Sequence, residues 1–183
     1  VTTDVSNIDD CKRLIDSAVE RFGTIHVLIN NAGISMRALF KDLDISVIEK
    51  LMSVNFWGAV YCTKFAIPYL LKNKGSVTGV SSIAGYKGLP ARTGYSASKF
   101  ALQGFLEVLR IENLNTGLHV MTACPGFTAS NIRNVALTAN GSLQGESPRD
   151  EAKMMTPTEV AYIIIKGIEK RKATVIMSAQ GKM

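Results

Sequence analysis

The sequence predicts a single α/β domain built on a doubly wound parallel sheet. Short apolar runs alternate with amphipathic stretches of helical length, and only short breaks separate them. Small and polar residues follow several of the apolar runs, at what would be the carboxyl ends of parallel strands, where proteins of this class bind their ligands. No linker or internal repeat divides the chain, so we expect one domain over residues 1–183.

The first elements are a helix and a strand. Asn7 can cap a helix that carries two Asp residues in its first turn, and Gly23 can end it. The apolar face of this helix would hold Cys11, Leu14, Ile15, Ala18, Val19 and Phe22. Residues 26–30 then form an apolar run, which predicts a buried strand.

A long helix is expected over residues 46–73. It is apolar on more than one face, so we expect it to pack both on the sheet and on a second subunit. The residues that give it this character are Leu51, Val54, Trp57, Tyr61 and Phe65. Pro68 lacks an amide hydrogen and should kink or restart the helix.

The remaining elements continue the alternation. We expect strands at residues 76–81, 118–124 and 173–177, and a helix over residues 95–113. The run Thr156-Pro157-Thr158-Glu159 combines a capping box with Pro at the first helical position, which predicts one more helix before the last strand. Residues 125–156 are polar and rich in Asn, Gly and Ser, which indicates either a lid or a tolerated surface insertion.

Composition excludes several classes of protein. With 46% hydrophobic and 20% charged residues, the chain has the composition of a soluble globular enzyme, and no apolar run approaches the roughly 20 residues of a membrane span. The net charge is +6, but Lys and Arg are scattered, so we expect no nucleic-acid partner. The three Cys residues lie far apart without metal-ligand spacing. We therefore expect no metal, free thiols in a reducing compartment, and a cytoplasmic location.

The most informative stretch is Tyr95-Ser96-Ala97-Ser98-Lys99. On a helix Tyr95 and Lys99 fall on one face, and Ser82 lies at the end of the preceding strand. An unperturbed Tyr has a pKa of about 10, so proton exchange through its phenolate at neutral pH needs a fixed positive charge nearby. Lys99 is placed to supply that charge, which makes Tyr95 a candidate proton donor. Taken alone, a Tyr and a Lys at this spacing are more often ordinary members of an amphipathic helix.

Further motifs appear around this stretch in a fixed order: Asn30-Asn31-Ala32-Gly33, then Asn55, then Ser81-Ser82, and later Pro125-Gly126. Together with Tyr95 and Lys99, their order and spacing resemble the short-chain dehydrogenase/reductase family over residues 4–160. The resemblance implies a Rossmann-like fold and hydride transfer between NAD or NADP, with a slight preference for NADP, and a small-molecule carbonyl or secondary alcohol. It implies a catalytic tetrad of Asn55, Ser82, Tyr95 and Lys99.

The resemblance also assigns a role to each residue. Tyr95 would be the general acid or base, Lys99 would lower the pKa of Tyr95 and hold the nicotinamide ribose, and Ser82 would polarise the substrate oxygen. Asn55 would anchor a water that relays protons to Lys99. Besides Tyr95 and Lys99, the implied cofactor contacts are Asp4, which would bind the adenine amino group, Val5, Asn31, Ala32, Gly33, Pro125, Gly126 and Thr128. Ser130 stands where many members have Thr, and it keeps the hydroxyl.

The same resemblance favours a lid over about residues 127–156, which would close over nicotinamide and substrate. Candidate apolar contacts to the substrate in this segment are Phe127, Met154 and Met155. Other residues expected around the pocket are Tyr86, Leu89 and Arg92. The two long helices resemble the subunit interface of the family, so we expect a homodimer or homotetramer.

The chain departs from the family at its start. Members begin with a strand, a glycine-rich phosphate turn and a helix, then a further strand and helix, roughly 60 residues in all. None of these precedes Val1. We therefore expect these residues to be a portion of a longer protein, and the chain alone to bind a dinucleotide weakly or not at all. Without those elements, residues 26–30 would form an unpaired sheet edge.

Two other classes of function stay open. One is a non-catalytic fragment or pseudoenzyme that acts as an interaction module through the two long helices, which the lack of an upstream glycine-rich turn in the coding sequence would favour. The other is a lyase or epimerase, because related folds also use Tyr and Lys with a bound nicotinamide. Net loss of NAD(P)H in a single turnover would exclude this second class.

Overall fold

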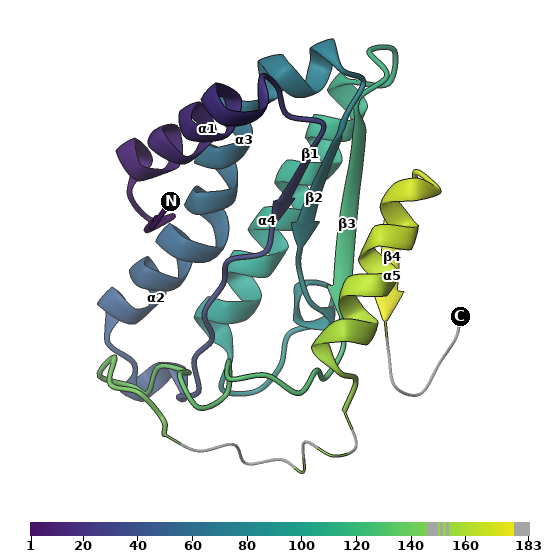
Figure 1. Ribbon diagram of the computed structural model, residues 1–183. Helices are drawn as coiled ribbons and strands as arrows, with labels where there is room; N and C mark the ends of the chain where they lie inside the picture. Colours follow the sequence, from purple (N-terminus) through teal and green to yellow (C-terminus); the bar gives the residue numbers. More distant parts are fainter. Residues whose placement is uncertain (146–149, 151, 153, 178–183) are drawn as a thin grey trace.

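The chain folds around a parallel sheet of four strands. The computed structural model describes residues 1–145, 150, 152 and 154–177. The strands β1 (Val27–Asn30), β2 (Ser76–Val80), β3 (His119–Pro125) and β4 (Thr174–Met177) follow one another across the sheet in sequence order. All three neighbouring pairs are parallel (Figure 1). The predicted α/β class with a parallel sheet is confirmed.

Helices cover the two faces of the sheet. The helices α3 (Gly58–Lys72) and α4 (Thr93–Glu112) pack on β1, β2 and β3, α1 (Ile8–Phe22) packs on α3, and α5 (Pro157–Glu169) packs on β3 and β4. Consecutive residues of β3 show that these are opposite faces. Val120 belongs to the apolar cluster that contains α4 residues, whereas Met121 belongs to the cluster under α5. In Figure 1 α5 accordingly lies apart from the other helices.

The first helix begins and ends as its sequence predicts. The Asn7 side chain accepts hydrogen bonds from the amides of Asp9 and Asp10, which would otherwise lack helical partners. Gly23 ends the helix with a φ of 77°, a left-handed conformation that glycine adopts without steric cost. Cys11 is buried, as expected for the apolar face. Phe22, in the last turn of the helix, is exposed instead.

The predicted long helix is irregular, but not where the sequence suggests. Helix α2 (Ile45–Met52) runs into a π-helical turn (Ser53–Trp57) before α3 begins. Helix α3 continues through Pro68, so the helix does not restart there, and the expected kink stays a prediction. The irregularity lies around Asn55, whose buried side chain makes tertiary hydrogen bonds in the wider turn.

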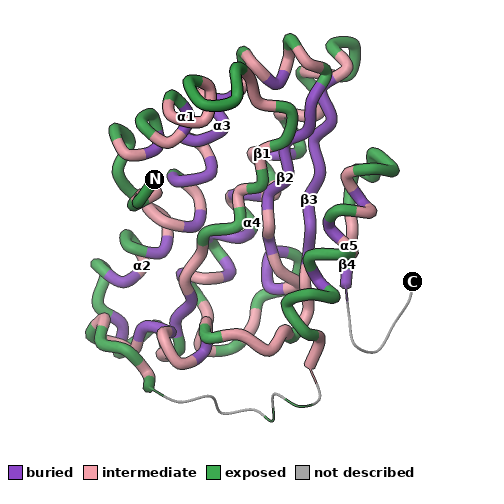
Figure 2. The backbone as a smooth tube through the Cα atoms, in the orientation of Figure 1, coloured by how far each residue is buried: buried purple, intermediate pink, exposed green. Residues whose placement is uncertain are grey.

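Strand β1 lies at an edge of the sheet and is not buried. It pairs with β2 alone within the described part of the chain. Val27 and Ile29 are 47% and 42% exposed, whereas β2 and β3 are buried along most of their length (Figure 2). The expectation of a buried strand was therefore wrong, while the expected sheet edge is present.

The segment that follows β3 crosses the carboxyl ends of the strands (Figure 1). It forms isolated bridges, in which Met36 pairs with Leu137 and Thr128 pairs with Met155. Leu137 is buried in a small cluster with Met36, so this part of the segment is packed on the domain. The capping box that follows is confirmed: the Thr156 hydroxyl accepts from the Glu159 amide, and the Glu159 carboxylate accepts from the Thr156 amide at 2.7 Å.

Two negative findings concern the described residues. Cys11, Cys62 and Cys124 are all buried and form no disulfide, as expected. None of the described helices combines the length and the apolar character needed to cross a membrane.

His119 is a buried titratable group at the amino end of the sheet. Its Nε2 lies 2.9 Å from the Lys172 carbonyl oxygen, and its Nδ1 lies 2.8 Å from the Ser76 hydroxyl. Because a carbonyl can only accept, Nε2 carries the hydrogen and the neutral ring accepts the Ser76 hydroxyl at Nδ1. Burial holds the pKa of His119 below its ordinary value of 6.5. The neutral ring therefore joins β2, β3 and the α5–β4 turn.

We expect His119→Gln to lower the free energy of unfolding at neutral pH by about 1–3 kcal/mol, because buried polar groups lose a partner. The folded wild type binds fewer protons at this site than the unfolded chain, so its stability falls as the pH drops below 6.5 towards the folded pKa. The difference in stability between wild type and variant should therefore shrink over this range. Urea titrations across pH would measure it, with His26→Gln at the exposed second histidine as control. A difference that stays constant with pH would contradict this account.

Candidate active site

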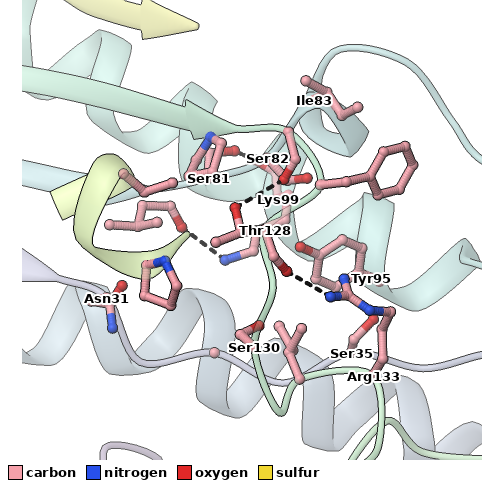
Figure 3. A pocket seen from close by; sticks show the side chains of 18 of the residues that line it. Asn31, Ser35, Ser81, Ser82, Ile83, Tyr95, Lys99, Thr128, Ser130 and Arg133 are labelled. Carbon is pink, nitrogen blue, oxygen red and sulfur yellow. Dashed lines mark hydrogen bonds between the residues drawn. The ribbon is translucent and has the colours of Figure 1, made fainter. Parts of the chain in front are cut away.

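A pocket of about 720 Å³ opens at the carboxyl ends of the strands. Its walls come from the ends of β1 and β2, the first turns of α4, the segment after β3 and one side of α5. Eight of the residues predicted for the active site or cofactor line it: Asn31, Gly33, Ser82, Tyr95, Lys99, Pro125, Gly126 and Thr128. Figure 3 shows Tyr95, Lys99 and Ser82 around one space. The topology thus brings together residues that are up to 97 positions apart, from Asn31 to Thr128.

Four predicted residues do not line this pocket. Asn55 lies behind it, and Ala32 is exposed next to it. Asp4 belongs to the turn before α1, where its carboxylate accepts from the Ser6 amide and hydroxyl, and these bonds lower the pKa of Asp4. Val5 packs on α3, since a Cβ added at Gly58 would lie 2.8 Å from the Val5 side chain. The cofactor roles of Ala32, Asp4 and Val5 stay predictions.

Tyr95 and Lys99 lie on one face of α4, as their spacing requires. The Lys99 Nζ is 5.8 Å from the centroid of the Tyr95 ring. Lys99 is 4% exposed, and its ammonium donates to the Val80 carbonyl oxygen at 2.9 Å. Burial lowers the pKa of Lys99 to about 8. The residue is therefore a cation at neutral pH that loses its charge only slightly above it.

Burial raises the pKa of Tyr95, and the neighbouring Ser82 hydroxyl and Arg92 guanidinium lower it only in part. Tyr95 is therefore protonated at neutral pH. The expected lowering of this pKa by Lys99 stays a prediction.

Arg92 places its own positively charged guanidinium at the edge of the pocket. It precedes α4 and donates through Nη1 to the Ser35 hydroxyl at 3.1 Å and to the Met36 carbonyl oxygen. These bonds attach the start of α4 to the chain that leaves β1. Because a guanidinium does not titrate in the physiological range, Arg92 gives Tyr95 a permanent positive neighbour.

Ser82 begins a short turn immediately after β2. Its side chain accepts from the Ala84 amide at 3.2 Å and so caps the 3₁₀ turn Ile83–Gly85. The preceding Ser81 is buried, and its hydroxyl accepts from the Gln103 side chain at 2.9 Å. The two adjacent serines therefore serve different neighbours, and only Ser82 is beside the Tyr95 phenol.

Asn55 is a buried junction between three segments. Its Oδ1 accepts from the Ile34 amide at 2.8 Å, and its Nδ2 donates to the Ile34 carbonyl oxygen at 3.0 Å. The same Nδ2 donates to the Ser98 hydroxyl at 2.9 Å. A Cβ at Gly33 would lie 3.2 Å from the Asn55 Oδ1 and 3.4 Å from the Lys99 Nζ, so a glycine here leaves room for both groups.

Of the three apolar residues that were expected to contact the substrate from the segment after β3, only one lines the pocket. Phe127 lines the pocket, as do Leu89 and Arg92, whereas Met154, Met155 and Tyr86 do not. Met155 packs instead in the apolar cluster beneath α5. The expected lid over residues 127–156 stays a prediction, and positions 146–149, 151 and 153 lie outside the described residues.

Sequence reasoning missed two features of this pocket. Arg133 is 8% exposed, lines the pocket and donates through Nη2 to the Thr128 carbonyl oxygen at 2.6 Å. No periodic pattern surrounds Arg133 in the sequence, so no local signal predicted it. The second feature is an apolar wall on α5, made by Val160, Ala161, Ile164 and Ile165. Within the described residues, no group of three or more His, Cys, Asp or Glu side chains could hold a metal ion.

The geometry agrees with comparisons to known proteins. The family model described as short chain dehydrogenase matches residues 1–140. The chain is 38% identical over 179 residues to 11-beta-hydroxysteroid dehydrogenase-like 4A of Arabidopsis thaliana, covering 96% of this chain and 57% of that protein. The chain belongs to the short-chain dehydrogenase/reductase family.

Other members support this assignment. Dehydrogenase/reductase SDR family member 7B of Danio rerio is 34% identical over 182 residues, covering 99% of this chain and 59% of that protein. The chain thus spans less than two thirds of the length of these curated relatives. An alcohol dehydrogenase from the archaeon Thermococcus sibiricus, complexed with 5-hydroxy-NADP, matches the fold with a TM-score of 0.80 and 20% identity. That match covers 96% of this chain and 71% of that one.

Replacement of Arg92 should change the titration of Tyr95. We expect Arg92→Gln to raise the pKa of Tyr95 further, because the variant removes a charge that favours the phenolate. Arg92→Lys should leave the pKa closer to that of the wild type. The Cζ chemical shift of carbon-labelled tyrosine, followed by NMR against pH, would measure it, with Arg21→Gln on α1 as control. An unchanged Tyr95 titration in Arg92→Gln would contradict the assignment.

Proposed function

We propose that the protein containing this chain is an NAD(P)-dependent oxidoreductase that transfers a hydride between nicotinamide and a small-molecule carbonyl or secondary alcohol. The observation that carries the proposal is the convergence of Tyr95, Lys99 and Ser82 on one pocket at the carboxyl edge of the sheet. A phenol, an ammonium and a hydroxyl around one space are suited to protonating and polarising a substrate oxygen.

The residues present fit the nicotinamide end of the cofactor. Gly33 and Gly126 line the pocket without side chains, so a ligand can approach the backbone there. Lys99 has three N–H donors, of which one goes to the Val80 carbonyl oxygen, and we assign it to the ribose hydroxyls. Asn31, Pro125 and Thr128 would complete this part of the site. When bound, NAD(P)H supplies the hydride.

The proton chemistry follows from the burial of Tyr95. Because its pKa is raised, Tyr95 holds its proton at neutral pH and can donate it to a carbonyl oxygen as that oxygen gains negative charge. Ser82 would donate a hydrogen bond to the same oxygen. In the reverse direction Tyr95 must first lose its proton, and Arg92 favours that phenolate.

NADP is the first cofactor to test. The Thermococcus enzyme was solved with 5-hydroxy-NADP, and a structure titled ElxO with NADP bound matches this fold with a TM-score of 0.81 and 24% identity. Titration with NADPH and with NADH, followed by nicotinamide fluorescence, would separate the two. The roles of Asp4, Val5 and Ala32 at the adenosine end belong to this proposal.

The substrate would be a ketone or secondary alcohol on an apolar skeleton. The relatives named hydroxysteroid dehydrogenase-like and the apolar wall on α5 both support this class.

We further propose a cytoplasmic homodimer or homotetramer that associates through α3 and α4. Trp57, Phe100, Val108 and Ile111 supply exposed apolar side chains on or beside these helices, and the three thiols are free. Sedimentation of the whole protein as a monomer at micromolar concentration would contradict the oligomer.

The decisive variant is Tyr95→Phe, measured in the protein as its complete coding sequence produces it. We expect kcat to fall at least about 100-fold, because the general acid is lost while the ring still packs. The absorbance of reduced nicotinamide, followed with a panel of ketones and secondary alcohols, measures the rate. Tyr162→Phe, at an exposed position on α5, is the matched control.

Each alternative gives a different outcome in this assay. A wild-type protein that binds neither cofactor and turns over no substrate would indicate the pseudoenzyme or interaction module. Conversion of substrate without net loss of NAD(P)H would indicate a lyase or epimerase. Turnover by Tyr95→Phe at the wild-type rate would remove Tyr95 from the mechanism.

A further inference from the structure

Ser98 is the most deeply buried polar side chain of α4. It is 0% exposed and does not line the pocket. Its hydroxyl donates to the Tyr95 carbonyl oxygen at 2.8 Å and accepts from the Asn55 Nδ2 at 2.9 Å. A single hydroxyl thus joins the backbone of Tyr95 to the side chain of Asn55.

The other end of this link is fixed. The Asn55 amide is bound to both the N–H and the carbonyl oxygen of Ile34, in the chain that leaves β1. Asn55 itself sits in the π-helical turn between α2 and α3. The Ser98 hydroxyl therefore connects the first turns of α4 to two other segments through direct hydrogen bonds of normal length.

The link lies next to the groups that would react. Lys99 follows Ser98 in the chain, and Tyr95 precedes it by one helical turn. The Asn55 Oδ1 and the Lys99 Nζ also lie beside the same glycine, since a Cβ added at Gly33 would be 3.2 Å from the first and 3.4 Å from the second. A displacement of the first turns of α4 relative to Asn55 would move the phenol and the ammonium together.

We propose that Ser98 is a positioning residue for hydride transfer, whose hydroxyl holds the Tyr95 and Lys99 turn of α4 on the Asn55 amide. The inference rests on the proposed function and adds a residue that acts through Tyr95 and Lys99, without contact to the substrate. Small errors in the placement of reacting groups lower the rate steeply, so the effect falls on kcat.

A second serine on the same helix provides a matched control. Ser96 is also buried, at 8% exposure, but its hydroxyl has no hydrogen-bond partner among the described residues. Removal of either hydroxyl deletes one oxygen from the same two turns of α4. Only Ser98→Ala removes the link to Asn55.

The test compares Ser98→Ala with Ser96→Ala in the protein produced from its complete coding sequence, with NADPH, or NADH if that is the cofactor bound, and a substrate that the wild type reduces. We expect Ser98→Ala to lower kcat about tenfold and to leave KM for the cofactor within about twofold. Ser96→Ala should change neither constant. Ser98→Thr should recover most of kcat, because a helical Thr can place its hydroxyl on the same carbonyl.

Two further measurements keep the proposal falsifiable if Ser98→Ala folds poorly. The first is the variant Ser98→Cys, which retains the size of the side chain with a weak donor and should lose an intermediate fraction of kcat. The second is a double-mutant cycle with Asn55→Ala. In Asn55→Ala the link is already broken, so a further change of Ser98 should cost much less than it does in the wild-type background. Additive effects would overturn the positioning role.

The outcomes separate this inference from the proposed function. A wild-type protein without hydride transfer overturns the proposed function. An active wild type whose Ser98→Ala variant keeps its kcat and loses only thermal stability overturns the positioning role alone. Equal losses of kcat in Ser98→Ala and Ser96→Ala would overturn it as well, because only one of these hydroxyls reaches Asn55.

Discussion

The buried amide of Asn55 is the interaction on which the rest of the site depends. Three hydrogen bonds from one side chain hold the exit of β1, the turn between α2 and α3, and the start of α4 at fixed distances. A buried amide left without partners costs about 1–3 kcal/mol, so the three segments are stable only in the arrangement that satisfies it. The π-helical turn follows from this requirement, since it places Asn55 against Ile34.

Burial also sets the charges of the pocket. It lowers the pKa of Lys99 to about 8 and raises that of Tyr95, so each group is driven towards its neutral form. Two guanidiniums, those of Arg92 and Arg133, reach the same pocket and donate to backbone carbonyl oxygens. Their charges add to the positive potential in the pocket, and the charge of Lys99 titrates close to the physiological range.

The sequence predicted what depends on local signals. Asn7, Gly23 and the Thr156 capping box each satisfy backbone groups within a few residues, and all three act as expected. The resemblance to the family located the motifs that meet in the pocket. The π-helical turn and the electrostatic effect of Arg92 on the pKa of Tyr95 could not be predicted, because they depend on partners far away in the chain or on burial. The exposure of β1 follows from its place at the sheet edge, which the resemblance to the family predicted, whereas the apolar run alone predicted a buried strand.

The protonation state of Tyr95 determines which direction of the proposed reaction it can assist. With its pKa raised, the phenol carries its proton at neutral pH and, in the reaction that we propose, would donate it to the carbonyl oxygen. Oxidation of an alcohol needs the phenolate, and burial opposes it while Ser82 and Arg92 favour it. In the proposed reaction an increase in pH would favour alcohol oxidation by supplying the phenolate, but Lys99 loses its charge near pH 8, before Tyr95, whose pKa is raised above its ordinary value of 10, loses its proton. No pH range therefore favours both the phenolate and the Lys99 ammonium, and Arg92 is the positive neighbour that still favours the phenolate once Lys99 is neutral.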